Sequence, residues 1–88
     1  SLSEIAMTIK TIEAMLPGVI YLSPAPDAPP YKTAGDKVAV GETVALVEVM
    51  KSYLPVEADC SGTFLGYAVE TGATVEPGEP ICRLEAAE

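Results

Sequence analysis

The chain contains few side chains that could carry out chemistry by themselves. It has no histidine, and its two cysteines, Cys60 and Cys82, are not spaced as a C-x-x-C pair. Structural zinc needs about four clustered cysteine or histidine ligands, so the sequence argues against a metal site. The lack of histidine also removes the commonest general acid or base near neutral pH. We therefore expect neither a metal centre nor stand-alone catalysis.

One lysine is a candidate for covalent modification by another protein. Lys51 follows Met50 between two runs of β-forming residues, where a two-residue turn would join antiparallel strands. Such turns favour Asn-Gly or Asp-Gly, because their central residues need positive φ. A Met-Lys turn costs about 1–2 kcal/mol per residue, and such strain occurs more often at functional sites. A lysine ammonium in water is not a nucleophile, so an enzyme must act on it. The alternative is an ordinary solubilising charge.

The residues that flank this turn predict one hairpin register. Inward-facing residues oppose one another, and the expected pairs are Val49 with Ser52, Val47 with Leu54, Ala45 with Val56 and, on the outer face, Glu48 with Tyr53. The same alternation leaves Val44 and Leu46 as apolar residues on the outer face.

An internal repeat places the turn near a centre of symmetry. Seven residues recur 37 residues later: Gly35, Val38, Gly41, Glu42, Val44, Val47 and Glu48 match Gly72, Val75, Gly78, Glu79, Ile81, Leu84 and Glu85. Gly18 and the apolar residues after it match Gly62 and its successors with a spacing of 44. Two similar β-halves predict a quasi-two-fold fold whose junction lies near residue 50.

Apolar runs and turn signals predict an all-β domain. Short runs of valine, isoleucine and tyrosine alternate with Gly and Pro turns, as in a sandwich or barrel. Residues 4–10 are expected to form a first strand, and a helical turn over residues 11–16 is the alternative to its continuation.

Cys60 falls in the turn at residues 59–62, whereas Cys82 shares the inward parity of Leu84, so we expect Cys60 to be reactive and Cys82 inert.

The change of spacing from 44 to 37 means that the first half contains seven additional residues. They fall within residues 23–33, where four prolines prevent regular strand pairing. We expect a protruding, stiffened loop there, called the insertion below. A disordered linker is the alternative.

The length and charge narrow the class of protein. The 88 residues carry a formal net charge of −8, which fits one small acidic domain. This charge argues against nucleic acid as a partner, because phosphate binding needs Lys and Arg. No apolar run approaches the roughly 18–20 residues of a membrane span, and no basic-then-apolar leader opens the chain. We therefore expect a soluble, cytoplasmic protein with no membrane segment.

Taken together, these residues resemble the biotinyl/lipoyl attachment domain family. The similarity is carried by Glu48-Val49-Met50-Lys51, by residues 56–63 and 69–72, and by Val75 and residues 77–80. Met50 before the lysine is more similar to biotin carboxyl carrier proteins than to lipoyl domains, which usually have Asp there. The insertion resembles the thumb of the carrier subunit of bacterial acetyl-CoA carboxylase.

The resemblance implies a fold and a role. The fold would be a flattened barrel or sandwich of two four-stranded antiparallel sheets, with residues 1–16 as leader and first strand and residues 17–88 as carrier domain. The site residues would be Lys51, as the biotin attachment point, with Glu48, Val49, Met50 and Ser52 around it, and Pro24, Pro26, Asp27 and Ala28 in the thumb. The carrier itself would not be an enzyme.

The resemblance also implies partners. A biotin protein ligase would attach biotin, and the modified lysine would move a carboxyl group from a biotin carboxylase to a carboxyltransferase, for acetyl-CoA carboxylation in fatty acid synthesis. The family usually has Ala-Met-Lys-Met, where this chain has Val49 and Ser52. One alternative is a lipoyl carrier of a 2-oxoacid dehydrogenase or of glycine cleavage, modified at the same Lys51. The other is an unmodified binding module with the same fold.

Overall fold

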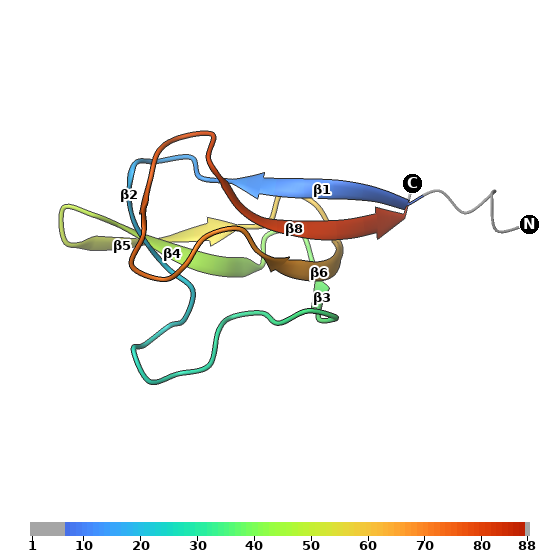
Figure 1. Cartoon of the computed structure of the whole chain (residues 1–88), viewed down its shortest axis with the longest axis horizontal. Helices are drawn as coiled ribbons and strands as arrows, with labels where there is room; N and C mark the ends of the chain where they lie inside the picture. Colours follow the sequence, from blue (N-terminus) through green and yellow to red (C-terminus); the bar gives the residue numbers. More distant parts are fainter. Residues whose placement is uncertain (1–6, 88) are drawn as a thin grey trace, which may run out of the picture.

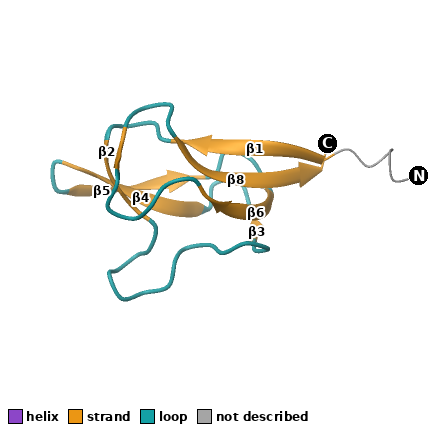
Figure 2. Cartoon of the chain, in the orientation of Figure 1, coloured by secondary structure: helices purple, strands orange, loops and turns teal. Residues whose placement is uncertain are grey.

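The computed structural model describes residues 7–87 of the chain. Within them, strands and loops account for all the structure, and the two sheets have four strands each (Figures 1 and 2). The strands are β1 (Met7–Glu13), β2 (Gly18–Tyr21), β3 (Lys37–Val38), β4 (Thr43–Val49), β5 (Ser52–Glu57), β6 (Gly62–Tyr67), β7 (Thr74–Val75) and β8 (Pro80–Ala87). One sheet has the order β1-β8-β6-β3 and the other β5-β4-β2-β7, with antiparallel neighbours. The predicted sandwich of two four-stranded antiparallel sheets is confirmed.

The repeat in the sequence is a repeat in the sheets. β3 and β7 lie at equivalent edges and are 37 residues apart, whereas β2 and β6 lie at equivalent inner positions and begin 44 residues apart. β4 and β8 occupy the other two inner positions, and β5 and β1 the remaining edges. The predicted quasi-two-fold arrangement is therefore confirmed strand by strand.

A pair of glycines shows how closely the two halves repeat. Gly18 opens β2, and a Cβ built on it would overlap the carbonyl oxygen of Glu48. Gly62 opens β6, and its Cβ would lie 2.6 Å from the carbonyl oxygen of Glu85. Since Glu48 and Glu85 are themselves repeat partners, the same close approach of two backbones occurs twice, and a side chain at either glycine would push the strands apart.

The core lies between the two sheets. Its largest fully buried side chains come from both halves, namely Phe64, Ile20, Ile81, Leu84, Val44, Val75 and Cys82. Val44 is completely buried, so the expected position on the outer face is wrong. The β4–β5 register shifts between Thr43 and Ala45, so Val44 is an extra residue in a bulge, and both Val44 and Ala45 face the core. Leu46, which pairs with Tyr21 and Pro55, is half-buried.

The first strand extends further than expected. β1 covers residues 7–13 and pairs with β8 from Met7–Ala87 to Glu13–Pro80. The predicted strand is thus confirmed over residues 7–10, while its first three residues, 4–6, lie outside the described part. The helical turn considered for residues 11–16 is wrong, because residues 11–13 continue the strand and residues 14–16 form a loop.

Candidate functional site

Lys51 lies at the tip of the β4–β5 hairpin. The register is the predicted one, with Val49 opposite Ser52, and Met50 and Lys51 form the two-residue turn between them. Met50 has a φ of 51° and Lys51 a φ of 67°, both in the left-handed region that this turn type requires. Both side chains are exposed, Met50 to 93%. Figure 1 places this hairpin at one end of the long axis and the paired ends of β1 and β8 at the other.

The amine of Lys51 is accessible to a modifying enzyme. Within residues 7–87, no hydrogen bond or ion pair of the structure involves its Nζ. The rest of the hairpin is fixed, because β4 pairs with β5 on one side and with β2 on the other. The sheet therefore presents an unattached ammonium group on a rigid support, which suits a side chain that must be acylated by another protein.

A polar and aromatic cluster supports the hairpin from its outer face. Tyr21 donates a hydrogen bond from its hydroxyl to Oε1 of Glu48 at 3.0 Å. Tyr53 stands opposite Glu48, and the Tyr21 and Tyr53 rings are 5.8 Å apart between centroids, tilted by 50°. The bond to Glu48 raises the pKa of Tyr21, since it favours the protonated hydroxyl. The cluster thus fixes Glu48, which was predicted as a site residue, three positions before the lysine.

Tyr21 was missed by sequence reasoning. It ends β2, two positions before the first residue of the insertion, and its match in the second half is not a tyrosine. Its role depends on the pairing of β2 beside β4, which brings Tyr21 level with Leu46 and within reach of Glu48. No local signal in the sequence carries that information.

The other predicted site residues around the lysine divide between core and surface. Val49 is half-buried and packs against the core, as the predicted inward parity requires. Ser52, its partner across the hairpin, is exposed. The two departures from the family pattern therefore have different environments: Val49 affects packing beneath the turn, and Ser52 affects the surface beside Lys51.

The insertion forms a loop without strands along one side of the sandwich (Figure 2). Its outer residues Pro24, Pro26 and Asp27 are exposed, and Ala28 is half-buried and donates its N–H to Ala25 O at 3.1 Å. A bond of 2.8 Å from Tyr31 N to Leu22 O closes the neck of the loop. In Figure 1 its outer turn lies toward the hairpin end of the long axis.

The structure does not bring the predicted thumb residues into polar contact with Lys51. Within residues 7–87, the side chains and backbone of the insertion bond to its own residues and, outside it, to Leu22, Asp36, Lys37, Glu42 and Tyr67. Leu22, Ser23 and Pro30, at its base, line a shallow groove together with Val69, Glu70 and Thr71. The insertion is thus held at its base and leaves its outer turn exposed.

The two cysteines lie in different environments. Cys82 is completely buried, as expected, and burial raises the pKa of its thiol to about 12. Cys60 is half-buried and packs against the core, and burial followed by the charge of Asp59 raises the pKa of its thiol as well. Cys60 is therefore less exposed than the turn position suggested, and its reactivity stays a prediction.

Across residues 7–87, no three His, Cys, Asp or Glu side chains are grouped so that they could hold a metal ion. The same part of the chain has no helix long and apolar enough to cross a membrane.

Comparison with known proteins gives the family. The model of the biotin/lipoyl family, described as "Biotin-requiring enzyme", matches residues 10–84. The chain is 35% identical over 74 residues to the biotin carboxyl carrier protein of acetyl-CoA carboxylase of Streptococcus pyogenes. These 74 residues are 84% of this chain and 45% of that protein. It is 35% identical over 74 residues to the chloroplastic biotin carboxyl carrier protein of acetyl-CoA carboxylase 1 of Arabidopsis thaliana, covering 84% of this chain and 26% of the relative.

A third relative shows the same coverage. The biotin carboxyl carrier protein of acetyl-CoA carboxylase of Haemophilus influenzae is 32% identical over 74 residues, which is 84% of this chain and 48% of that protein. The chain therefore spans between a quarter and a half of the length of these relatives.

Proposed function

Because the chain belongs to the biotinyl/lipoyl attachment domain family, we propose that it is a biotin carboxyl carrier domain modified at Lys51. The observation that carries this proposal is the position of Lys51: it is the exposed second residue of a strained two-residue turn, at the tip of a hairpin in a quasi-symmetric sandwich. Relatives over most of this chain are named biotin carboxyl carrier proteins of acetyl-CoA carboxylase, and this supports acetyl-CoA carboxylation as the reaction served.

The residues around Lys51 fit an amide-linked biotin. The amide bond would form at Lys51 Nζ, which is free of polar contacts among residues 7–87. Bound biotin supplies the group that carries the carboxyl. The four-carbon side chain of Lys51 supplies the reach, since the residue is exposed in the turn between Val49 and Ser52.

Among residues 7–87, no hydrogen bond or ion pair joins a base to the amine of Lys51. The chain contains no histidine, and the nearest carboxylate along the strand, Glu48, accepts a hydrogen bond from Tyr21. The proton of the Lys51 ammonium must therefore be removed by the partner that acylates it, which we propose is a biotin protein ligase. What the domain contributes is position: the β4 and β5 pairing holds the tip in one conformation while the partner acts.

A carrier of this kind works by tethering. Because the cofactor is attached to the domain, a docked domain presents it to the partner's active site at an effective concentration of about millimolar. The cofactor needs no second binding step of its own. We propose a biotin carboxylase and a carboxyltransferase as the two partners, with the exposed end of the insertion contacting the arm or a partner enzyme. The acidic surface, with a net charge of −8, suits fast docking on basic patches. We place this activity in the cytoplasm.

The biotin carrier is favoured over the lipoyl alternative by Met50. Its side chain is 93% exposed next to Lys51, so a modifying enzyme meets a methionine there instead of the Asp usual in lipoyl domains. The proline-rich insertion favours the same assignment.

Intact mass spectrometry tests the proposal directly. The domain should gain the mass of one biotinyl group when it is co-expressed with biotin ligase, and Lys51→Arg should abolish this gain while leaving the thermal unfolding temperature unchanged. The remaining cations, Lys10, Lys32, Lys37 and Arg83, serve as internal controls. A lipoyl mass increment, or biotin that persists in the Lys51→Arg variant, would contradict the assignment.

A further inference from the structure

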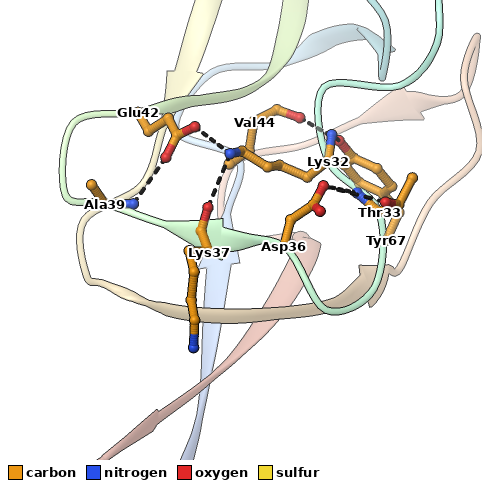
Figure 3. Close-up of polar contacts among 8 residues, drawn as sticks. All are labelled: Lys32, Thr33, Asp36, Lys37, Ala39, Glu42, Val44 and Tyr67. Carbon is orange, nitrogen blue, oxygen red and sulfur yellow. Dashed lines mark hydrogen bonds and ion pairs between the residues drawn. The ribbon is translucent and has the colours of Figure 1, made fainter.

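The insertion carries a lysine that folds back onto the sandwich. Lys32 follows the neck of the loop, and its side chain is only 13% exposed. Its Nζ forms an ion pair with Glu42 and donates to the carbonyl oxygen of Lys37 at 3.0 Å (Figure 3). Two separate groups of the sandwich therefore hold one ammonium group, at the point where the insertion rejoins the sheet.

The backbone of Lys32 is held as well. Its N–H donates to the hydroxyl of Tyr67 at 3.3 Å, and that hydroxyl donates to Val44 O at 2.7 Å. The Tyr67 ring packs edge-on against the buried Phe64, with centroids 4.8 Å apart. Burial raises the pKa of Tyr67 to about 12, which extends toward higher pH the range in which its hydroxyl stays protonated and donates to Val44 O. Lys32 is thus connected to the core through its backbone and to the surface turn through its side chain.

The repeat shows that the ion pair is an addition to the fold. Glu42 accepts the Ala39 N–H through Oε1 at 2.9 Å, and its repeat partner Glu79 accepts the Glu76 N–H through Oε1 at 3.0 Å. The two glutamates therefore close equivalent turns. Only Glu42 also pairs with a lysine among residues 7–87, and that lysine belongs to the insertion that the second half lacks. The turn at Glu79 forms without an ion pair, so the turn at Glu42 does not need one. The ion pair of Glu42 therefore holds the insertion and not the turn.

The neck explains why such an anchor matters. The bond between Tyr31 N and Leu22 O closes residues 22–31 into a loop that joins the sandwich at one place. A loop closed at a narrow neck can swing as a unit unless a further contact fixes its direction. Lys32, the residue directly after the neck, provides that contact. Lys32 beside Glu42, with the Ala39 N–H, also lowers the pKa of the Glu42 carboxyl, which keeps the pair charged.

We propose that Lys32 is a positioning residue for carboxyl transfer: its anchor on Glu42 and Lys37 sets the direction of the insertion, and thereby where the insertion meets the carrier arm or a partner enzyme. This inference rests on the proposed function of the insertion. It predicts that loosening the anchor weakens transfer while the attachment of biotin to Lys51, at the hairpin, is unaffected.

The test compares Glu42→Gln with its matched control Glu79→Gln. Glutamine keeps an amide oxygen for the backbone N–H in each turn, so the two variants lose the same charge, and only Glu42→Gln loses the ion pair. Each variant of the 88-residue chain is biotinylated and assayed with biotin carboxylase and carboxyltransferase for kcat and KM of carboxyl transfer. Trypsin cleavage after Lys32, followed by mass, reports the mobility of the anchor. We expect Glu42→Gln to be cleaved there about threefold to fivefold faster, as loss of one weak ion pair allows, and to lose a similar factor in kcat/KM.

Further variants separate the possible failures. Lys32→Met should reproduce the transfer defect, Lys32→Arg should restore most of the activity, and ligation rates should match the wild type throughout. Equal defects in Glu42→Gln and Glu79→Gln, or a wild-type transfer rate in Glu42→Gln and Lys32→Met, would overturn the inference. A variant with residues 23–31 replaced by a short glycine-containing turn tests the premise: if it is biotinylated and transfers at the full rate, the proposed role of the insertion fails, together with this inference, while the assignment of Lys51 stands.

Discussion

Replacing Met50 by asparagine should stabilise the domain and slow its modification. Met50 has a φ of 51°, in a region that costs a residue such as methionine about 1–2 kcal/mol. Asparagine adopts this conformation readily and is the preferred first residue of this turn type. Because the Met50 side chain is 93% exposed, its removal loses little packing. We expect Met50→Asn to gain about 0.5–1.5 kcal/mol in the free energy of unfolding.

The assay is thermal unfolding of the unmodified domain, where 1 kcal/mol corresponds to about 4–8 °C for a chain of this size. Met50→Ala is the matched control, since alanine also lacks the methionine side chain but keeps the left-handed cost. Only Met50→Asn should raise the unfolding temperature, whereas both variants should show a lower initial rate of biotinylation if the ligase contacts the methionine. Equal stability of Met50→Asn and wild type would refute the strain argument. Unchanged biotinylation of both variants would show that the methionine is not recognised.

Three further predictions concern the core and the sheets. Burial raises the pKa of Cys82 from 9.0 to about 12, so the folded state holds the thiol proton more tightly than the unfolded state does. The contribution of this proton to the free energy of unfolding is complete below pH 9 and is lost as the pH rises toward 12. By pH 11 the loss should reach about 2–3 kcal/mol, and urea unfolding of wild type against Cys82→Val should show that difference; parallel pH profiles would contradict it. A thiol reagent should modify Cys60 before Cys82 in the native protein, and both at the same rate in denaturant. Two thiols that react fast in the native protein would contradict the inward orientation of Cys82 in β8. Gly62→Ala should destabilise the domain by about 2 kcal/mol or more, since its Cβ would meet the Glu85 carbonyl, whereas alanine at the exposed Leu65 should cost less than half of that; calorimetry that ranks them the other way would contradict the close packing.

The hairpin could be predicted because its two constraints are local. Alternation sends every second residue inward, and a two-residue turn fixes which residues face each other, so the register of Val47 with Leu54 followed directly from the sequence. The repeat then supplied the symmetry that alternation alone lacks.

The errors arose where the structure depends on contacts distant in the sequence. Val44 is buried through a bulge that alternation does not signal. The bond of Tyr21 to Glu48 requires β2 to lie beside β4. The ion pair of Lys32 with Glu42 likewise forms only because the insertion folds back onto the sandwich.

The pairing of Met7 with Ala87 brings the first and last described residues of the sandwich side by side. β1 and β8 meet there as an antiparallel edge pair, in the place that the symmetry gives to the β5 and β4 hairpin at the opposite end. A short turn joining these two residues would convert the sandwich into a cyclic topology without moving a strand. New ends could then be opened in the outer part of the insertion, where the exposed prolines take no part in the sheets. A variant made of residues 7–87 would then be a circular permutant in which the attachment lysine is unchanged and the new Met7–Ala87 connection forms a second hairpin tip.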